Sequence, residues 1–232
     1  MKYVVALPQQ AFLPVTNSSD RYPVKRIYCV GRNYAAHAIE MGGDPDREEP
    51  FFFQKNPDNL VINDEDFPYP DKSSDVHHEI ELVVALGNLP DDGLADITVE
   101  QAQGYIWGHA VGIDMTRRDL QAKCKEQRRP WEIGKGFDHS APCGSLSPVN
   151  VTGQLMQGEI SLLVNGEVRQ SGDLNQLIWK VPEVISYLSG LFKLYSGDLI
   201  MTGTPSGVGP VQRGDILTGR IEGLSEMTCK VV

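Results

Sequence analysis

Two glutamates placed two positions apart are the residues best suited to act together in chemistry. Glu79 and Glu81 lie in the run 77–86, which is continuously apolar after Glu81 and ends at Gly87. A compact apolar run that stops at a turn-prone glycine predicts a strand. Because side chains alternate along a strand, both carboxylates would point to one face, about 6–7 Å apart along it.

A buried position for these two carboxylates would require a compensating charge. Residues 82–86 are apolar on both faces, which is typical of a strand covered on both sides. Two carboxylates at its edge repel each other and lose hydration, which costs several kcal/mol while both stay ionised. A hard divalent cation would offset that cost. A frayed strand end with both glutamates in water is the alternative, and these residues alone do not decide between the two.

A third carboxylate strengthens the case for a cation. Asp114 directly follows a predicted strand, 105–113. Three oxygen ligands suit Mg²⁺ or Mn²⁺, with water or substrate oxygens in the remaining positions. The sequence does not favour zinc, because the four cysteines form no Cys-x-x-Cys pair and His77 and His78 would face opposite sides of a strand. The scattered cysteines indicate free thiols in a reducing compartment.

Three further groups have side chains or backbone suited to catalysis or anion binding. His37 and Glu40 are three positions apart on a predicted helix and share a face, as a base and its orienting partner would. Lys135 stands between two glycines and would suit a developing oxyanion. The glycine-rich run 203–209 would suit an anion, although it lacks the ending of a P-loop. Each group also has an ordinary interpretation, as a solvated helix face or a surface turn.

Composition limits the classes of protein to consider. The 232 residues, 41% hydrophobic and 22% charged, are expected to form one folded domain, 21–232, after a lead-in segment, 1–20. The net charge of −10 disfavours a nucleic-acid partner. No stretch approaches the roughly 20 apolar residues of a membrane span. The N-terminal apolar run is too short for a signal peptide, so we expect a cytoplasmic protein with no membrane partner.

Strand and turn signals dominate the rest of the chain. Asn165-Gly166 between two apolar runs predicts a hairpin, and Thr98 with Gln101 predicts a capping box. The pattern predicts strands at 27–30, 51–55, 105–113, 160–164, 168–170, 199–202, 215–221 and 226–232, and helices at 34–41 and 182–194. Because the strands show no regular βαβ alternation, we expect an α+β, β-rich fold with a strongly curved sheet.

Two segments beside these elements are expected to serve the site. Thr116 is predicted as the N-cap of a helix that follows Asp114, and Gln121 on that helix would share the face of Asp114. Residues 42–50 are rich in glycine, proline and charge, which is typical of lids. We expect this segment to order when a substrate binds.

Four motifs of the chain occur in the same order in a known enzyme family. They are Cys29–His37, His77–Leu82, Asp114–Gln121 and Thr202–Gly209. Together they resemble the fumarylacetoacetate hydrolase family, and within it the short acylpyruvate hydrolase branch. The Arg117-Arg118 pair and Gly136-Phe137-Asp138 are closer to the fumarylpyruvate hydrolases of that branch.

The resemblance implies a mixed β-sandwich roll with a few peripheral helices, assembled as a homodimer. It also implies a bound divalent cation, Mg²⁺ or Mn²⁺, with Ca²⁺ as a substitute in crystals. By position it assigns metal ligands (Glu79, Glu81, Asp114), a water-activating pair with an oxyanion-stabilising lysine (His37, Glu40, Lys135) and substrate contacts (Arg118, Gln121, Thr204, Lys55).

The resemblance also implies a reaction on a small 2-oxo or diketo acid. Members of the family cleave a carbon–carbon bond: the metal holds the 2-oxo-carboxylate end, water attacks the distal carbonyl and pyruvate enolate leaves. For this chain the implied reaction converts fumarylpyruvate to fumarate and pyruvate. Oxaloacetate decarboxylation or keto–enol isomerisation at the same metal site is one alternative. A non-catalytic, metal-stabilised β protein is another.

The chain departs from the family pattern at three points. It has no counterpart of a further aspartate ligand found in longer members. Gly136 stands where many short members have serine, and Arg117 where many have alanine. The extra cation at Arg117 would suit a substrate with a second carboxylate.

Overall fold

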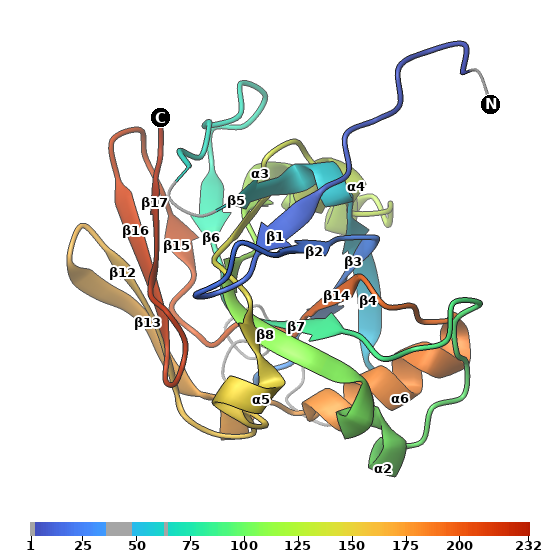
Figure 1. Ribbon diagram of the computed structural model, residues 1–232. Helices are drawn as coiled ribbons and strands as arrows, with labels where there is room; N and C mark the ends of the chain where they lie inside the picture. Colours follow the sequence, from blue (N-terminus) through green and yellow to red (C-terminus); the bar gives the residue numbers. More distant parts are fainter. Residues whose placement is uncertain (1–2, 36–47, 63–64) are drawn as a thin grey trace.

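The computed structural model describes residues 3–35, 48–62 and 65–232, and its strands form one large sheet and three smaller ones (Figure 1). Residues 36–41 of the predicted helix 34–41 and residues 42–47 of the predicted lid 42–50 lie outside these residues. The large sheet runs in the order β4-β3-β14-β7-β8-β10-β5, with β11 also paired to β8. Its strands are β3 Arg26–Gly31, β4 Phe51–Lys55, β5 Leu60–Ile62, β7 Ile80–Leu86, β8 Ile106–Ile113, β10 Ala141–Cys143, β11 Ser147–Pro148 and β14 Asp198–Met201. Two of its pairings, β3 with β14 and β5 with β10, are parallel, so the sheet is mixed.

The centre of this sheet is buried on both faces, as the apolar run predicts. All seven residues of β7 are buried. Leu82 and Val84 belong to one apolar cluster, whereas Val83 and Ala85 belong to a second cluster on the opposite face. The strand therefore gives its carboxylate-bearing end a fixed backbone within the core.

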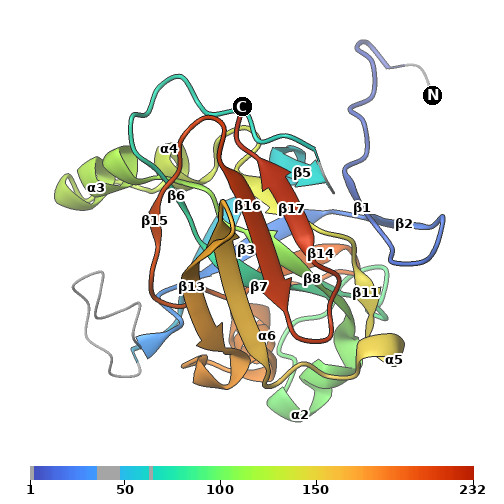
Figure 2. The ribbon, with the colours of Figure 1, turned by 90° about the vertical axis from the view of Figure 1, so that its left-hand side faces the viewer.

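A second sheet covers one face of the first and makes a sandwich, which Figure 2 shows from the side of the second sheet. Its order is β13-β12-β16-β17, with bounds β12 Glu159–Val164, β13 Glu167–Asp173, β16 Ile216–Ile221 and β17 Met227–Lys230. Asn165 and Gly166 both have positive φ, which confirms the predicted hairpin turn. Gly219 allows the sheets to approach closely, because a Cβ there would lie 2.7 Å from Ile80 and 2.8 Å from Val111.

Short elements surround this sandwich. The remaining strands are β1 Phe12–Pro14 paired with β2 Arg21–Pro23, and a three-stranded sheet of β15 Gly209–Pro210, β6 Val76–His78 and β9 Thr116–Arg117. The helices are α2 Val99–Ala102, α3 Arg118–Glu126, α4 Glu132–Lys135, α5 Val149–Thr152 and α6 Val181–Leu191, with 3-10 turns at Pro57–Asn59, Gln103–Tyr105 and Leu174–Gln176. The capping box at Thr98 is confirmed. In the part of the chain that the structure describes, no helix is long and apolar enough to span a membrane.

The predicted strand over residues 77–86 is interrupted at Glu79. Before it, β6 pairs with β15 and β9; after it, β7 pairs with β14 and β8 in the large sheet. The backbone oxygen of Glu79 accepts a hydrogen bond of 2.8 Å from the N–H of Asp114, which ties the junction to the end of β8. The break therefore places Glu79 beside Asp114. An uninterrupted strand over residues 77–86 would instead have stayed in the large sheet.

The prediction of Thr116 as a helix N-cap is wrong. Thr116 belongs to β9, and α3 begins two residues later, with Arg117 in an extended conformation before it. The Thr116 hydroxyl contacts the backbone oxygen of Asp114 at 3.1 Å and Lys135 Nζ at 2.7 Å. Helix α6 also differs from its prediction, because Phe192 adopts an extended conformation and ends the helix at Leu191.

Candidate metal centre

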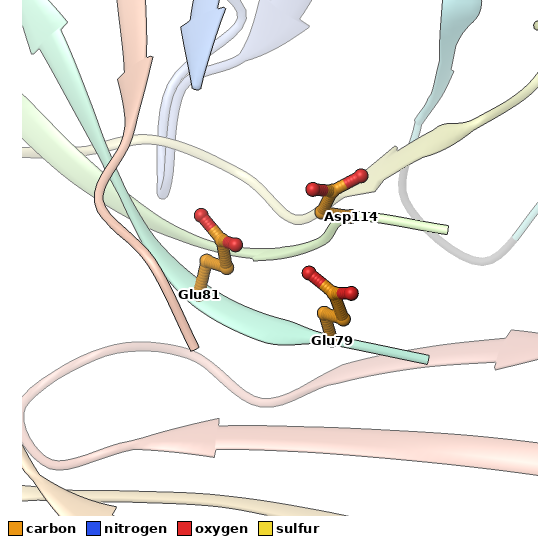
Figure 3. Close-up of side chains that lie close together, drawn as sticks. All are labelled: Glu79, Glu81 and Asp114. Atoms are coloured by element: carbon orange, nitrogen blue, oxygen red, sulfur yellow. The ribbon is translucent and has the colours of Figure 1, made fainter. Parts of the chain in front are cut away.

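Three carboxylates meet where β7 and β8 lie side by side (Figure 3). Glu79, Glu81 and Asp114 are all buried, and one carboxylate oxygen from each lies within 4.8 Å of the others. Glu81 is held on β7 opposite Gly112, and its Oε2 accepts a hydrogen bond of 2.8 Å from the N–H of Gly203. The neighbouring strands thus bring together the three residues that the sequence predicts as metal ligands.

The electrostatics of this cluster fit a divalent cation. Burial, followed by the charges of Asp114 and Glu79, raises the pKa of Glu81 well above its usual value. Close carboxylates with little water favour either a shared proton or a bound cation. The donors are all hard carboxylate oxygens, which are the ligands that Mg²⁺ and Mn²⁺ prefer. The residues present therefore fit such a cation.

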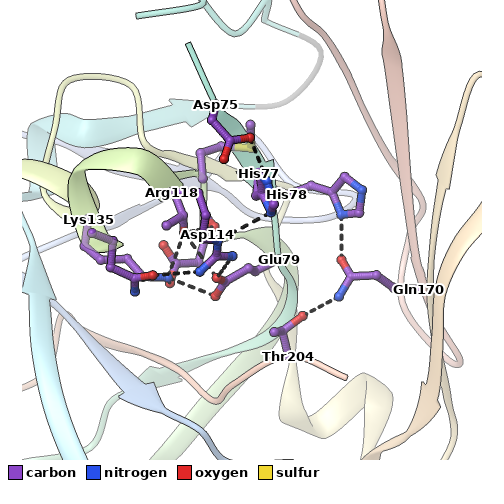
Figure 4. Close-up of polar contacts among 12 residues, drawn as sticks. Asp75, His77, His78, Glu79, Asp114, Arg118, Lys135, Gln170 and Thr204 are labelled. Carbon is purple, nitrogen blue, oxygen red and sulfur yellow. Dashed lines mark hydrogen bonds and ion pairs between the residues drawn. The ribbon is translucent and has the colours of Figure 1, made fainter. Parts of the chain in front are cut away.

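Lys135 lies against the carboxylates and uses its ammonium group fully (Figure 4). Its Nζ donates to Glu79 Oε2 at 2.9 Å, Asp114 Oδ2 at 2.6 Å and Thr116 Oγ1 at 2.7 Å. Burial disfavours the charged form, but Asp114 and Glu79 outweigh it and the pKa of Lys135 is raised. The interpretation of Lys135 as a surface turn is wrong, because it ends α4 and is 2% exposed.

Arg118 makes a second contact with the cluster and is itself bonded to Gln121. Arg118 Nη2 donates to Glu79 Oε1 at 2.6 Å, and its Nη1 donates to Gln121 Oε1 at 2.8 Å. Both residues lie on the first turn of α3, which packs closely on α4: a Cβ at Gly134 would lie 3.0 Å from Gln121 Cα. This packing fixes Arg118 and Gln121 relative to Lys135.

Lys55 lies behind Asp114. Its side chain is fully buried, its Nζ is 2.8 Å from Asp114 Oδ1, and it donates to the backbone oxygens of Met115, at 3.1 Å, and Lys135. This geometry favours a role for Lys55 in holding Asp114 in place, and not the predicted contact of Lys55 with a substrate.

A pocket opens beside the carboxylates. The three acids line it together with Arg118, Gln121, Lys135 and Thr204, which brings these predicted site residues into one space. His37 and Glu40 lie outside the described residues, so the roles predicted for them stay predictions. The catalytic and substrate-binding roles of the lining residues also stay predictions.

Two positively charged residues of the pocket are not among the site residues predicted from the sequence. Arg32 and Lys125, here called the cationic rim, line the same pocket. Burial and the nearby charges of Arg118 and Arg32 lower the pKa of Lys125 to about 8. Lys125 lies seven positions after Arg118 on α3, a spacing that places both on one helix face and offered a usable signal.

The extra cation predicted at Arg117 does not line this pocket. The Arg117 guanidinium lies 4.3 Å from the centre of the Phe137 ring, whereas the neighbouring Arg118 lines the pocket. Arg117 ends β9 and Arg118 begins α3, and only Arg118 of the pair lines the pocket. The additional positive charges of this pocket come from Arg32 and Lys125.

The model of the family described as "Fumarylacetoacetate (FAA) hydrolase C-terminal" matches residues 26–232. The chain belongs to the fumarylacetoacetate hydrolase family. This membership confirms the resemblance based on the four motifs, and with it the prediction of an enzyme from a family of carbon–carbon hydrolases. The predicted β-rich roll is confirmed as well.

Relatives within this family carry more than one activity in their names. A fumarylpyruvate hydrolase of Ralstonia sp is 42% identical over 82% of this chain and 98% of its own length. A mitochondrial oxaloacetate tautomerase of Arabidopsis thaliana is also 42% identical, over 87% of this chain and 88% of its own. The crystal structure of a fumarylpyruvate hydrolase from Pseudomonas aeruginosa in complex with Mn²⁺ and pyruvate is 50% identical, with a TM-score of 0.96 over 100% of this chain and 99% of that one.

Proposed function

We propose that this protein is a metal-dependent hydrolase of acylpyruvates that converts fumarylpyruvate to fumarate and pyruvate. The observation that carries the proposal is the cluster of three buried carboxylates, with oxygens within 4.8 Å, in one pocket with Lys135 and Arg118. The relatives named as fumarylpyruvate hydrolases support it.

In this proposal Glu79, Glu81 and Asp114 hold Mg²⁺ or Mn²⁺. When bound, the cation supplies Lewis acidity and a template for the 2-oxo-carboxylate oxygens of the substrate. Lys135 contributes a permanent positive charge, because Glu79 and Asp114 keep it protonated. A positive charge fixed beside the reacting carbonyl stabilises the negative charge that develops on its oxygen.

Hydrolysis requires an activated water, which the proposal assigns to His37 and Glu40. The hydroxyl of water adds to the distal carbonyl carbon, the carbon–carbon bond breaks, and its electron pair leaves with the pyruvyl part as an enolate. Protonation of that enolate gives pyruvate. An imidazole oriented by a carboxylate suits the removal of the water proton.

The cationic rim supports fumarylpyruvate over a substrate with an uncharged acyl group. Fumarylpyruvate carries a second carboxylate at its distal end, whereas acetylpyruvate ends in a methyl group. Arg32 and Lys125 line the pocket in addition to Arg118 and Lys135. Cations beyond those that contact the acidic cluster suit a substrate dianion.

One substrate panel tests the proposal. The purified protein, supplied with Mg²⁺ or Mn²⁺, should release pyruvate from fumarylpyruvate faster than from acetylpyruvate, and a chelator should stop both reactions. A protein that releases pyruvate from neither compound would refute the proposal. The predicted homodimer and cytoplasmic location are separate proposals, and sedimentation velocity tests the first.

Tautomerisation or decarboxylation of oxaloacetate is the second candidate, and the name of the Arabidopsis thaliana relative favours it. His37→Ala separates hydrolysis from decarboxylation. Hydrolysis should fall by about 10²- to 10⁴-fold without its general base, whereas decarboxylation assisted by the metal needs no activated water and should persist.

A further inference from the structure

A buried glutamine connects the second sheet to the glycine-rich loop beside the carboxylates (Figure 4). Gln170 lies on β13 and is 0% exposed. Its side-chain amide contacts His78, Ile80, Thr204 and Pro205. None of the motifs in the sequence includes Gln170, and the roles proposed above do not use it.

The contacts of Gln170 fix the direction in which its amide points. The backbone N–H of Ile80 can only donate, and it lies 3.0 Å from Gln170 Oε1, so the oxygen must face Ile80. The same oxygen lies 2.9 Å from His78 Nδ1, which therefore carries a proton in this pairing. An amide turned the other way would leave a buried N–H facing another N–H.

The opposite end of the amide then determines the direction of the Thr204 hydroxyl. Gln170 Nε2 has two protons, one directed at the backbone oxygen of Pro205 at 2.9 Å and one at Thr204 Oγ1 at 2.7 Å. The Thr204 oxygen therefore accepts, and its own proton is left to donate elsewhere. Thr204 lines the pocket beside Glu79 and Glu81. Across residues 3–35, 48–62 and 65–232, no hydrogen bond of the structure takes that proton.

The loop cannot easily move away from this amide. Gly207 has a φ of +93°, and a Cβ there would lie 2.2 Å from the backbone oxygen of Arg169, next to Gln170. A Cβ at Gly172 would lie 2.8 Å from the Pro205 ring. The loop and β13 therefore touch on both sides of Gln170, which holds Thr204 at a fixed distance from the strand.

We propose that Gln170 is a positioning residue that keeps the Thr204 hydroxyl turned into the pocket as a hydrogen-bond donor to an anionic oxygen of the bound 2-oxo acid. The inference rests on the proposed function, because it takes the pocket to bind such an acid. A donor that is already oriented loses no freedom on binding and strengthens as negative charge grows on the oxygen it contacts.

A double-mutant cycle on oxalate binding tests the proposal without any turnover. Gln170→Met removes the amide and Thr204→Val removes the hydroxyl, and oxalate affinity of the Mn²⁺-loaded protein is measured by calorimetry. Each single variant should bind oxalate about 10- to 100-fold more weakly, as expected for a lost hydrogen bond to a charged group. Gln170→Met should change affinity less than about twofold in a Thr204→Val background, because it acts through the hydroxyl. Losses that multiply in the double variant would overturn the proposal, as would a wild-type protein that binds Mn²⁺ but no oxalate.

Two further variants separate this role from a structural one. Gln170→Glu keeps the acceptor for Ile80 but has no N–H for Thr204, so it replaces Gln170→Met in the cycle if the methionine variant does not fold. Thr204→Ser retains the hydroxyl and should keep oxalate affinity near the wild-type value. Ser189→Ala removes another buried hydrogen bond, from the N–H of Ile97 at 2.8 Å, far from the pocket. It should lower the melting temperature and leave oxalate affinity unchanged; a matching fall in affinity would show that lost stability alone explains the Gln170 variants.

The kinetic assay distinguishes failure of this inference from failure of the proposed function. A wild-type protein that hydrolyses no acylpyruvate removes the proposed hydrolase, while the oxalate cycle still decides the role of Gln170. If hydrolysis is observed, Gln170→Met should lower kcat/KM for fumarylpyruvate by about 10- to 100-fold, and Thr204→Val should again remove the sensitivity to residue 170.

Discussion

The carboxylate side of the pocket and its cationic rim are built by different means. Glu81 and Asp114 project from paired strands of the large sheet, and hydrogen bonds from the backbone N–H groups of Gly203 and Asp114 tie the cluster to its surroundings. Arg32 follows β3 in a left-handed conformation, with a φ of +55°, and Lys125 lies near the exposed end of α3. The carboxylate side holds its charges by burial and pairing, whereas the two residues of the cationic rim are half-buried.

The same difference appears in two lysines. Burial disfavours the charged form of both, but Asp114 and Glu79 raise the pKa of Lys135, whereas Arg118 and Arg32 help lower the pKa of Lys125. A lysine ammonium paired with carboxylates already has its counter-ions. A lysine ammonium placed among other cations is stabilised when an anion binds beside it. We propose that the carboxylate side carries out the chemistry and that the cationic rim selects the substrate.

Loss of a ligand on the carboxylate side should have the largest effect. Asp114→Asn removes the charge of a proposed oxygen ligand, so the melting temperature should no longer rise when Mn²⁺ is added. Hydrolysis of fumarylpyruvate should fall by about a thousandfold, because Lewis-acid stabilisation is worth several kcal/mol. Thermal-shift measurements and pyruvate release check both results.

A buried aspartate elsewhere in the same sheet provides the control. Asp198 is fully buried and pairs with Arg26 at 2.5 Å. Asp198→Asn should lower the melting temperature yet preserve its increase with Mn²⁺. An Asp114→Asn variant that still responds to Mn²⁺ would contradict the assignment of Asp114 as a ligand.

Neutralising Lys135 should have the next largest effect. Lys135→Met leaves Glu79 and Asp114 without their shared donor, and kcat should fall by about 10²- to 10³-fold, as for the loss of an oxyanion-stabilising group. The effect should be equal for fumarylpyruvate and acetylpyruvate, because both react through the same carbonyl. A loss of kcat confined to one substrate would show that Lys135 selects the substrate, as proposed for the cationic rim. It would contradict the distinction between the two sides of the pocket.

Much of the carboxylate side could be predicted from sequence because it depends on local rules. Alternation along a strand places Glu79 and Glu81 on one face, and a strand end places Asp114 beside them. The break in the strand at Glu79 could not be predicted, because it depends on pairing with β15, about 130 residues further along the chain. Long-range pairing of this kind leaves no periodic signal near the break.

The rim and the buried amide show where sequence reasoning ends. The position of Lys125 could have been predicted from its spacing to Arg118. The position of Arg32 depends on its positive φ, which no neighbouring residue predicts. Arg117 does not line the pocket, because it ends β9 and its guanidinium lies against the Phe137 ring. Gln170 lies in β13, an ordinary hairpin strand. Only the packing of the glycine-rich loop 203–209 against β13 brings the hydrogen-bond partners of its amide together.

A change in the rim should alter selectivity more than rate. Lys125→Met should raise KM for fumarylpyruvate by about tenfold, the value of a modest charged contact, and leave kcat within about twofold. Acetylpyruvate has no distal carboxylate and serves as the matched substrate, with an expected KM near that of the wild-type protein. Equal changes in KM for both substrates would show that Lys125 supports the pocket in general.

The smallest expected effect is a pH dependence that only the rim should show. Because the pKa of Lys125 is lowered to about 8, its ammonium is present below that pH and is lost as the pH rises through it. KM for fumarylpyruvate should therefore increase above about pH 8 towards that of Lys125→Met. In Lys125→Arg the increase should disappear, because a guanidinium remains charged throughout this range. Lys135 should add no step here, since its raised pKa keeps it protonated. The same increase in Lys125→Arg would assign the titration to another group and remove the distinction between the two sides.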